Sequence, residues 1–231
     1  MPRFEDLISH IQQNFPKNYW IIRWNESQPP NQGLIDIINI YNGALSKLDE
    51  ESWKEIKEKL FRKINKKDTG RGQADFFNTL NETLAYEYLI DIGNDYVSFI
   101  KENKKETPDI VYTNNGTINY CEVKTINISN EEILRMKNEG TFDTCIYSTL
   151  TENFFSKLES TINKAKHQLS TFTSYGLIYI ILNFDDFTNY YMDIYIEQLR
   201  SLIQKNNDCC YLYFRFGVLG KINIHDEYTV D

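Results

Sequence analysis

Three charged side chains stand in a part of the chain that otherwise has the composition of buried strands. Asp109 opens one apolar run, and Glu122 and Lys124 lie two residues apart in the next run. Because side chains alternate between the two faces of a strand, Glu122 and Lys124 share one face. If the two runs pair around the Asn-Gly turn signal at 115–116, Asp109 lies near both residues, at the end of the hairpin far from the turn. The spacing thus predicts two carboxylates and one ammonium group in a small volume.

This set of groups suits the chemistry of a metal ion and a phosphate. Two carboxylates at close range repel one another, and a shared proton or a divalent cation relieves the repulsion. Carboxylate oxygens with room for water suit Mg²⁺ or Mn²⁺, which can polarise a phosphodiester and lower the pKa of a bound water. A lysine beside the ion can orient that water or neutralise charge that develops on the phosphate. The residues therefore indicate metal-dependent hydrolysis of a phosphodiester.

The elements that must position these residues change in type near residue 70. Apolar residues at three- and four-residue spacing predict three helices before that point, over 3–15, 34–48 and 51–64. Gly70 and Gly72 interrupt the pattern, so we expect a hinge or exposed loop there. The sequence therefore predicts a helical N-terminal region at 1–70 and a second domain at 71–231.

Helical and strand patterns alternate in the second domain. In chain order they predict helix 73–92, strands 96–100, 108–113 and 118–126, helix 151–173, strand 176–184, helix 190–204 and strand 210–216. The first three strands are expected to form an antiparallel meander. The almost wholly apolar run at 176–184 suits a strand that is covered on both faces. Ser129 and Glu132 form a capping box, which predicts a short helix after the third strand.

The charged residues and the order of elements together resemble a known superfamily. A Pro-Asp pair that ends at Asp109, twelve further residues and the Glu-Val-Lys triplet at 122–124 look like the PD-(D/E)xK motif of the restriction-endonuclease-like nucleases. The order of helices and strands over 73–184 is similar to the αβββαβ core of that superfamily. The resemblance implies an α/β fold with a mixed sheet flanked by helices, extended at the N-terminus by the helical region.

The resemblance also implies roles for single residues. Asp109 and Glu122 would be ligands of Mg²⁺ or Mn²⁺, and Lys124 would be the catalytic lysine. Many members carry a further Glu on the helix before the first strand, and this chain offers Glu82 and Glu87 there. The spacing from the acid to the helix end favours Glu82 as the third ligand, and Glu87 stays open as the alternative.

The helix after the motif often carries a Gln or a Lys in this superfamily. Lys164 and Gln168 stand four residues apart in the helix predicted at 151–173, hence on one face. The resemblance places Gln168 in the catalytic set. We assign Lys164 to contact with nucleic acid.

Nucleic-acid contact requires a local basic patch, because the formal net charge of the whole chain is −8. Between residues 54 and 71, eight Lys and Arg residues are offset by three acids. The expected phosphate contacts from this run are Lys59, Arg62, Lys63, Lys66, Lys67 and Arg71. The ordinary alternative, a solvated helix face, stays open.

These observations lead us to expect a Mg²⁺-dependent deoxyribonuclease that acts on duplex DNA in restriction, phage defence or repair. Cleavage of both strands needs two sites, which is compatible with a homodimer. The alternative is a non-catalytic module of the same fold that binds a protein partner through its helical region and acidic surface.

Location follows from what the sequence lacks. No apolar run reaches the roughly eighteen residues of a membrane span, and the N-terminus has none of the features of a signal peptide. The four cysteines show no CxxC spacing, so we expect thiols in a reducing compartment. The sequence therefore predicts a cytoplasmic protein without membrane contact.

Overall fold

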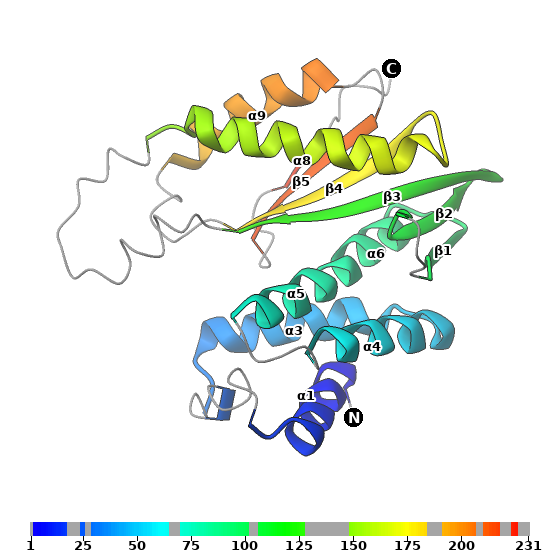
Figure 1. The fold of residues 1–231 in the computed structure, drawn as a ribbon, viewed down its shortest axis with the longest axis vertical. Helices are drawn as coiled ribbons and strands as arrows, with labels where there is room; N and C mark the ends of the chain where they lie inside the picture. Colours follow the sequence, from blue (N-terminus) through cyan, green and yellow to red (C-terminus); the bar gives the residue numbers. More distant parts are fainter. Residues whose placement is uncertain are drawn as a thin grey trace. The chain divides into compact units, whose positions relative to one another are not determined.

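The chain forms two compact units, Met1–Ile118 and Asn119–Asp231. The computed structural model describes residues 2–17, 24–25, 29–64, 70–101, 106–127, 148–183, 191–206, 210–217 and 223–225. The division between the units falls inside a strand, whereas the sequence predicted a division between 1–70 and 71–231. Each unit has helices and strands of its own (Figure 1).

The first unit combines helices with an antiparallel strand pair. Its elements are α1 (Arg3–Asn14), α3 (Gln32–Ser46), α4 (Glu50–Ile64), α5 (Gly70–Leu80), α6 (Glu82–Asp91), β1 (Tyr96–Phe99) and β2 (Ile110–Asn114). Helices α1, α3 and α4 confirm the three helices predicted before residue 70. In the strand pair, Tyr96 lies opposite Thr113 and Phe99 lies opposite Ile110. The predicted antiparallel pairing of the first two strands is therefore confirmed.

Helix α4 has a stripe of buried side chains that includes one charge. Ile56, Leu60 and Ile64 are buried, as their four-residue spacing predicts for an amphipathic helix. Lys59 directly precedes Leu60 and is buried with them. The sequence predicted an exposed phosphate contact at Lys59, and this prediction is wrong, because the side chain points into the first unit.

The loop predicted at Gly70 and Gly72 is also wrong, because α5 begins at Gly70 and includes both glycines. The first turn of a helix has backbone N–H groups without intrahelical partners in any case, so glycine is tolerated there. The single helix predicted over 73–92 is instead two helices, α5 and α6, that meet at one residue.

Asn81 is the residue between α5 and α6, and it is buried. Its side-chain oxygen accepts a hydrogen bond of 2.7 Å from the hydroxyl of Tyr41 in α3. Its backbone carbonyl accepts a tight hydrogen bond of 3.1 Å from the N–H of Leu84, three residues on. The interruption makes Glu82 the first residue of α6.

A two-residue turn follows β2 and is the tight turn that the Asn-Gly signal predicts. Asn115 has φ 50° and Gly116 has φ 76°. Positive φ at both central residues is the type I′ geometry, whose twist matches that of a hairpin. The next strand, β3 (Thr117–Ile126), begins directly after the turn.

The second unit is α/β, with a mixed sheet flanked by helices. After β3 it contains α8 (Glu152–Ser170), β4 (Gly176–Leu182), α9 (Met192–Asn206), β5 (Cys210–Phe216) and β6 (Asn223–His225). Its strands follow the order β3-β4-β5-β6, in which β4 runs parallel to β3 and β5 while β6 is antiparallel to β5. The coarse α/β class is confirmed. The sequence did not predict β6, and the helix predicted after Ser129 lies outside the described residues.

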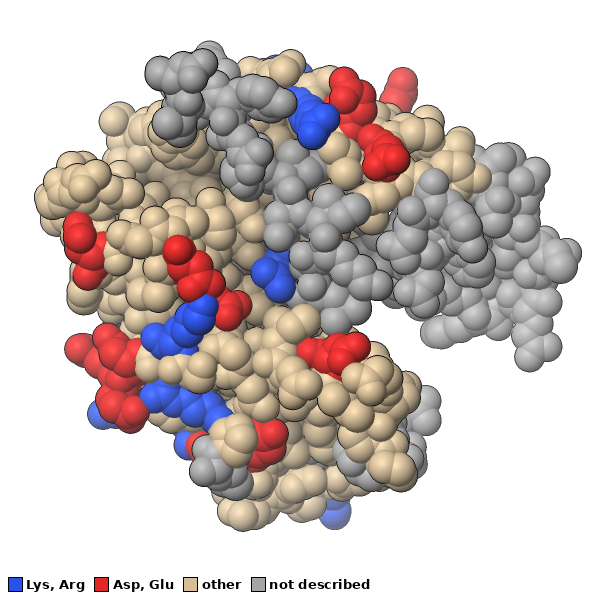
Figure 2. Space-filling view, turned by 180° about the vertical axis from the view of Figure 1, so that it is seen from behind, with Lys and Arg blue, Asp and Glu red and all other residues tan. Residues whose placement is uncertain are grey.

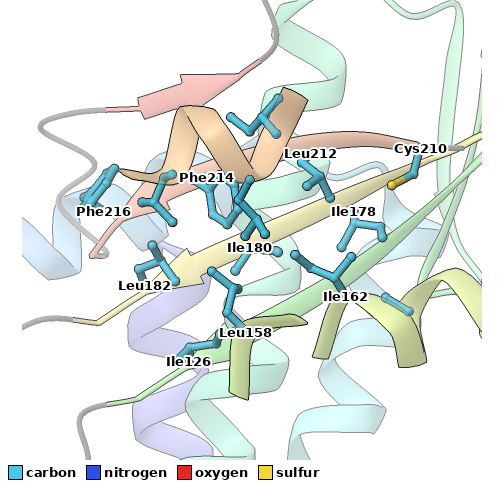
Figure 3. Close-up of a cluster of buried hydrophobic side chains, with 14 of the residues drawn as sticks. Ile126, Leu158, Ile162, Ile178, Ile180, Leu182, Cys210, Leu212, Phe214 and Phe216 are labelled. Carbon is cyan, nitrogen blue, oxygen red and sulfur yellow. The ribbon is translucent and has the colours of Figure 1, made fainter. Parts of the chain in front are cut away.

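Even-numbered and odd-numbered residues of β3 and β4 project from opposite faces of this sheet. Ile178, Ile180 and Leu182 of β4 pack in one core with side chains of α8 and α9 (Figure 3). The register pairs Glu122 with Ile178, and Lys124 with Ile180. Both charged residues therefore project from the face of the sheet that α8 covers. All of β4 is buried, which confirms the strand predicted to be covered on both faces.

The turn supports a first test. Gly116→Ala places a side chain at φ 76°, and we expect it to lower the free energy of unfolding by roughly 1–2 kcal/mol. The matched control is Gly43→Ala inside α3, where the added Cβ meets only Glu87 Oε1, at an ordinary 3.7 Å. Helix propensity predicts that this variant gains about 0.5–1 kcal/mol. Urea unfolding followed by circular dichroism measures both, and equal effects would contradict the turn assignment.

Candidate functional site

In the first unit, two of the predicted ligands share one cation. The ammonium of Lys59 lies 2.8 Å from Glu82 Oε2 and 3.4 Å from Asp109 Oδ1. The lysine comes from α4, the glutamate is the first residue of α6, and the aspartate directly precedes β2. The side chains of Lys59 and Glu82 are each 9% exposed, and that of Asp109 is 18% exposed. The structure thus makes two carboxylates converge on one positive nitrogen.

The electrostatics of this cluster follow from its burial. Charges removed from water interact more strongly than they do at the surface, and they are costly unless they are paired. Glu82 gains further stabilisation at the N-terminus of α6, where the helix dipole favours negative charge. Lys59 offsets the repulsion that Glu82 and Asp109 would otherwise exert on one another.

The same helix shows which glutamate lies beside Asp109. Glu87 is five residues after Glu82, so the two side chains leave α6 in different directions. Glu87 lies 3.5 Å from the ammonium of Lys47, which also binds Asp91. The hydrogen bond to Asp91 is the main cause that raises the pKa of Lys47. The geometry therefore favours Glu82 over Glu87, and its role as a ligand stays a prediction.

The second unit holds the other predicted site residues in one group. Lys124 in β3 donates to the carboxylate of Glu122 and, at 3.1 Å, to Oε1 of Gln168 in α8. The side chain of Glu122 is 2% exposed, whereas that of Lys124 is 27% exposed. This confirms that Glu122 and Lys124 share a face, and it adds Gln168 to that face. Lys164, one turn earlier on α8, is exposed.

The predicted basic face is only partly described. Lys63 is half-buried in the last turn of α4, while Lys66, Lys67 and the side chain of Arg71 lie outside the described residues. On the face shown in Figure 2, most Lys and Arg side chains lie beside Asp or Glu side chains. Within the first unit, for example, Lys57 of α4 pairs with Asp6. Contact of these basic residues with DNA stays a prediction.

Two tyrosines occupy the opposite face of the sheet in the second unit. Tyr179 of β4 stacks on Tyr213 of β5, with ring centroids 4.7 Å apart. Burial raises the pKa of both hydroxyls, and the charge of Arg215 lowers it to a smaller extent. Both tyrosines therefore stay protonated at neutral pH. They belong to the core and not to the group around Lys124.

Sequence reasoning missed the position of Lys59. The signal that could have revealed it was a charged residue within the apolar stripe of α4, next to Leu60. A solvated lysine on a helix is much more common than a buried one. The sequence alone therefore favoured the exposed interpretation.

The metal site and the family of this chain remain predictions. Across the described parts of the chain, no group of three or more His, Cys, Asp or Glu side chains is arranged to hold a metal ion. The ligand set Asp109, Glu122 and Glu82 thus stays a prediction.

None of the helices that the structure describes has the length and apolar character to cross a membrane. No family model, curated protein or solved structure matches the chain.

The group around Lys124 supports a second test, by a double-mutant cycle in metal-free buffer. Lys124→Met removes the ammonium beside the buried carboxylate of Glu122, so the free energy of unfolding should fall by about 1–3 kcal/mol. Adding Glu122→Gln should recover part of that loss, which gives a coupling of about 1 kcal/mol or more in urea unfolding.

The control for this cycle is the exposed pair Lys205–Glu159, whose side chains are 70% and 43% exposed. Lys205→Met should change the free energy of unfolding by less than about 1 kcal/mol, because solvent screens such pairs. Additive effects of Lys124→Met and Glu122→Gln would show that the two side chains are not energetically coupled.

Proposed function

We propose that this chain is a Mg²⁺-dependent deoxyribonuclease of the restriction-endonuclease-like type. The observation that carries the proposal is the convergence of Glu82 and Asp109 on one cation, the ammonium of Lys59. The buried carboxylate of Glu82 and the partly buried carboxylate of Asp109 accept a single positive charge, and they have the oxygen donors that Mg²⁺ and Mn²⁺ prefer.

The proposed ligand set also includes Glu122, as the sequence motif predicts. Asp109 directly precedes β2, and Glu122 lies in β3. The spacing of the motif in the sequence leads us to expect Asp109 and Glu122 in one ligand set. We propose that Glu82, Asp109 and Glu122 together hold the ion. When bound, the ion would act as a Lewis acid on a phosphodiester and lower the pKa of an attacking water.

Lys124 and Gln168 have two further roles in the proposal: Lys124 neutralises charge on the phosphate, and Gln168 positions Lys124. The side chain of Lys124 is 27% exposed, so its ammonium can meet a phosphate oxygen and offset charge that develops there. Gln168 accepts a hydrogen bond from Lys124 and thereby fixes the direction of its side chain. In this proposal Gln168 is a positioning residue, and the buried carboxylate of Glu122 holds the ammonium of Lys124 close by a hydrogen bond.

The proposed substrate is duplex DNA, held through phosphates by local basic residues. These residues are Lys63, Lys66, Lys67, Arg71 and Lys164. A homodimer would supply two sites for the two strands. Restriction, phage defence or repair in the cytoplasm is the setting in which a nuclease of this kind would act, by analogy with the superfamily.

Nicking of supercoiled plasmid tests the activity. The wild type should nick DNA with Mg²⁺ or Mn²⁺ and stop when EDTA is added. Asp109→Asn, Glu122→Gln and Lys124→Ala should each lower the rate by about a hundredfold or more, because each removes a group that binds or neutralises charge during hydrolysis. Glu159→Gln on the surface of α8 is the matched control and should nick at the wild-type rate.

The outcomes separate the two functions expected from the sequence. Metal-dependent nicking that Lys124→Ala abolishes supports the nuclease. A folded wild type that cleaves no form of DNA or RNA with either metal supports the alternative, a non-catalytic module that binds a protein partner.

Salt dependence tests how an acidic protein holds DNA. Phosphate contacts release counterions, so affinity should fall steeply with salt. Reversing Lys63, Lys66 and Lys67 to Glu should weaken binding about equally for all DNA sequences. The slope of log affinity against log salt should fall by up to about three. Fluorescence anisotropy with labelled duplexes measures both quantities.

The comparison variant reverses three lysines of α8, namely Lys157, Lys164 and Lys166. If the first variant keeps the wild-type affinity and slope while the α8 variant loses them, the DNA lies along α8 and the assignment to the basic run is wrong.

A further inference from the structure

We infer that Lys59 is the built-in counter-ion of Glu82 and Asp109: it holds the two carboxylates together without metal and competes with a divalent cation for them. The competition rests on the proposed function, because it takes the same carboxylates as metal ligands. The role of Lys59 as a counter-ion does not depend on nuclease activity.

Burial makes Lys59 unusual among the ion-paired lysines of the first unit. An ammonium removed from water is costly by several kcal/mol unless acids surround it, so a lysine inside an apolar stripe requires partners that are fixed in place. Glu82 and Asp109 meet this requirement at 2.8 Å and 3.4 Å. Lys57, two residues earlier on the same helix, pairs with Asp6 where both side chains are half-exposed. Lys57 is therefore the natural control.

The partners of Lys59 come from separate parts of the first unit. Glu82 is 23 residues away along the chain and Asp109 is 50 residues away. Lys59 therefore ties α4 to the start of α6 and to the residue before β2. It is a positioning residue: in this inference it touches the proposed ligands and not the substrate.

Lys59 and a divalent cation compete because both carry positive charge and both need the carboxylate oxygens of Glu82 and Asp109. A divalent cation that binds Glu82 and Asp109 takes the oxygens that now face the ammonium, so Lys59 must withdraw or share them. Two cations that use the same carboxylates weaken each other, with couplings that typically change affinity 5- to 150-fold. Lys59 thus raises the metal concentration at which the site fills, and it keeps the metal-free site assembled.

The test combines metal binding with metal-free stability, using Mn²⁺ as the probe. Lys59→Met keeps the apolar stem and removes the charge. We expect its Mn²⁺ dissociation constant, from isothermal titration calorimetry, to fall about tenfold. Its thermal midpoint in EDTA should fall by about 3 °C or more, because the two carboxylates lose their counter-ion. Lys57→Met should keep the wild-type Mn²⁺ affinity.

Two further variants exclude a merely structural effect. Lys59→Arg keeps the positive charge and should bind Mn²⁺ with nearly wild-type affinity. Lys59→Met with Glu82→Gln removes the repulsion together with the lysine, so its thermal midpoint in EDTA should rise above that of Lys59→Met alone. If Lys59→Met does not fold, the double variant compared with Glu82→Gln still reports the coupling between Lys59 and Glu82.

The outcomes distinguish this inference from the proposed nuclease. Wild-type Mn²⁺ affinity in Lys59→Met overturns the inference, even if the wild type nicks DNA. No Mn²⁺ binding by either protein overturns it as well. Tighter Mn²⁺ binding by Lys59→Met supports it, even if no variant cleaves any nucleic acid, and in that case only the nuclease is rejected.

Discussion

A carboxylate that is taken out of water needs a positive partner, and both units meet this requirement with a lysine. Lys59 lies between Glu82 and Asp109, and Lys124 lies beside Glu122. These pairs are costly to assemble in a low-dielectric interior, and removing one partner costs more than the pair itself contributes. A protein that only needed stability could use apolar side chains at these positions. Buried acids with matched lysines are thus compatible with the proposed function.

The secondary structure explains how each lysine meets its acid. In the second unit, strand alternation puts Glu122 and Lys124 on the face covered by α8, where the parallel register sets them beside the apolar residues of β4. Gln168 reaches Lys124 from the covering helix. In the first unit, the interruption at Asn81 starts a new helix at Glu82 and presents its carboxylate to α4. Strand alternation and the helix interruption thus bring together the side chains around Lys124 and around Lys59.

The parts of the structure that depend on short-range patterns could be predicted from the sequence. The four-residue stripe of α4 and the Asn-Gly turn at 115–116 are both found where the sequence indicates them. The interruption at Asn81 could not be predicted, because its buried side chain depends on Tyr41, 40 residues away. The burial of Lys59 was missed for the same reason, since Glu82 and Asp109 are distant in the chain. At Asn81 and Lys59 the predictions failed because a polar group depends on a long-range partner.

The two lysines differ in what can reach them, and the difference separates their roles. The side chain of Lys59 is 9% exposed and lies against two acids, so a phosphate group has little access to its ammonium. Lys124 is 27% exposed, and its neighbour Gln168 is a neutral acceptor. The buried ammonium of Lys59 lies where a metal ion would bind the two acids in the proposed function. The partly exposed ammonium of Lys124 can also contact an anion. The charge of Lys59 thus serves the carboxylates of Glu82 and Asp109, and of these two lysines Lys124 is the one whose ammonium a substrate could reach in the proposed function.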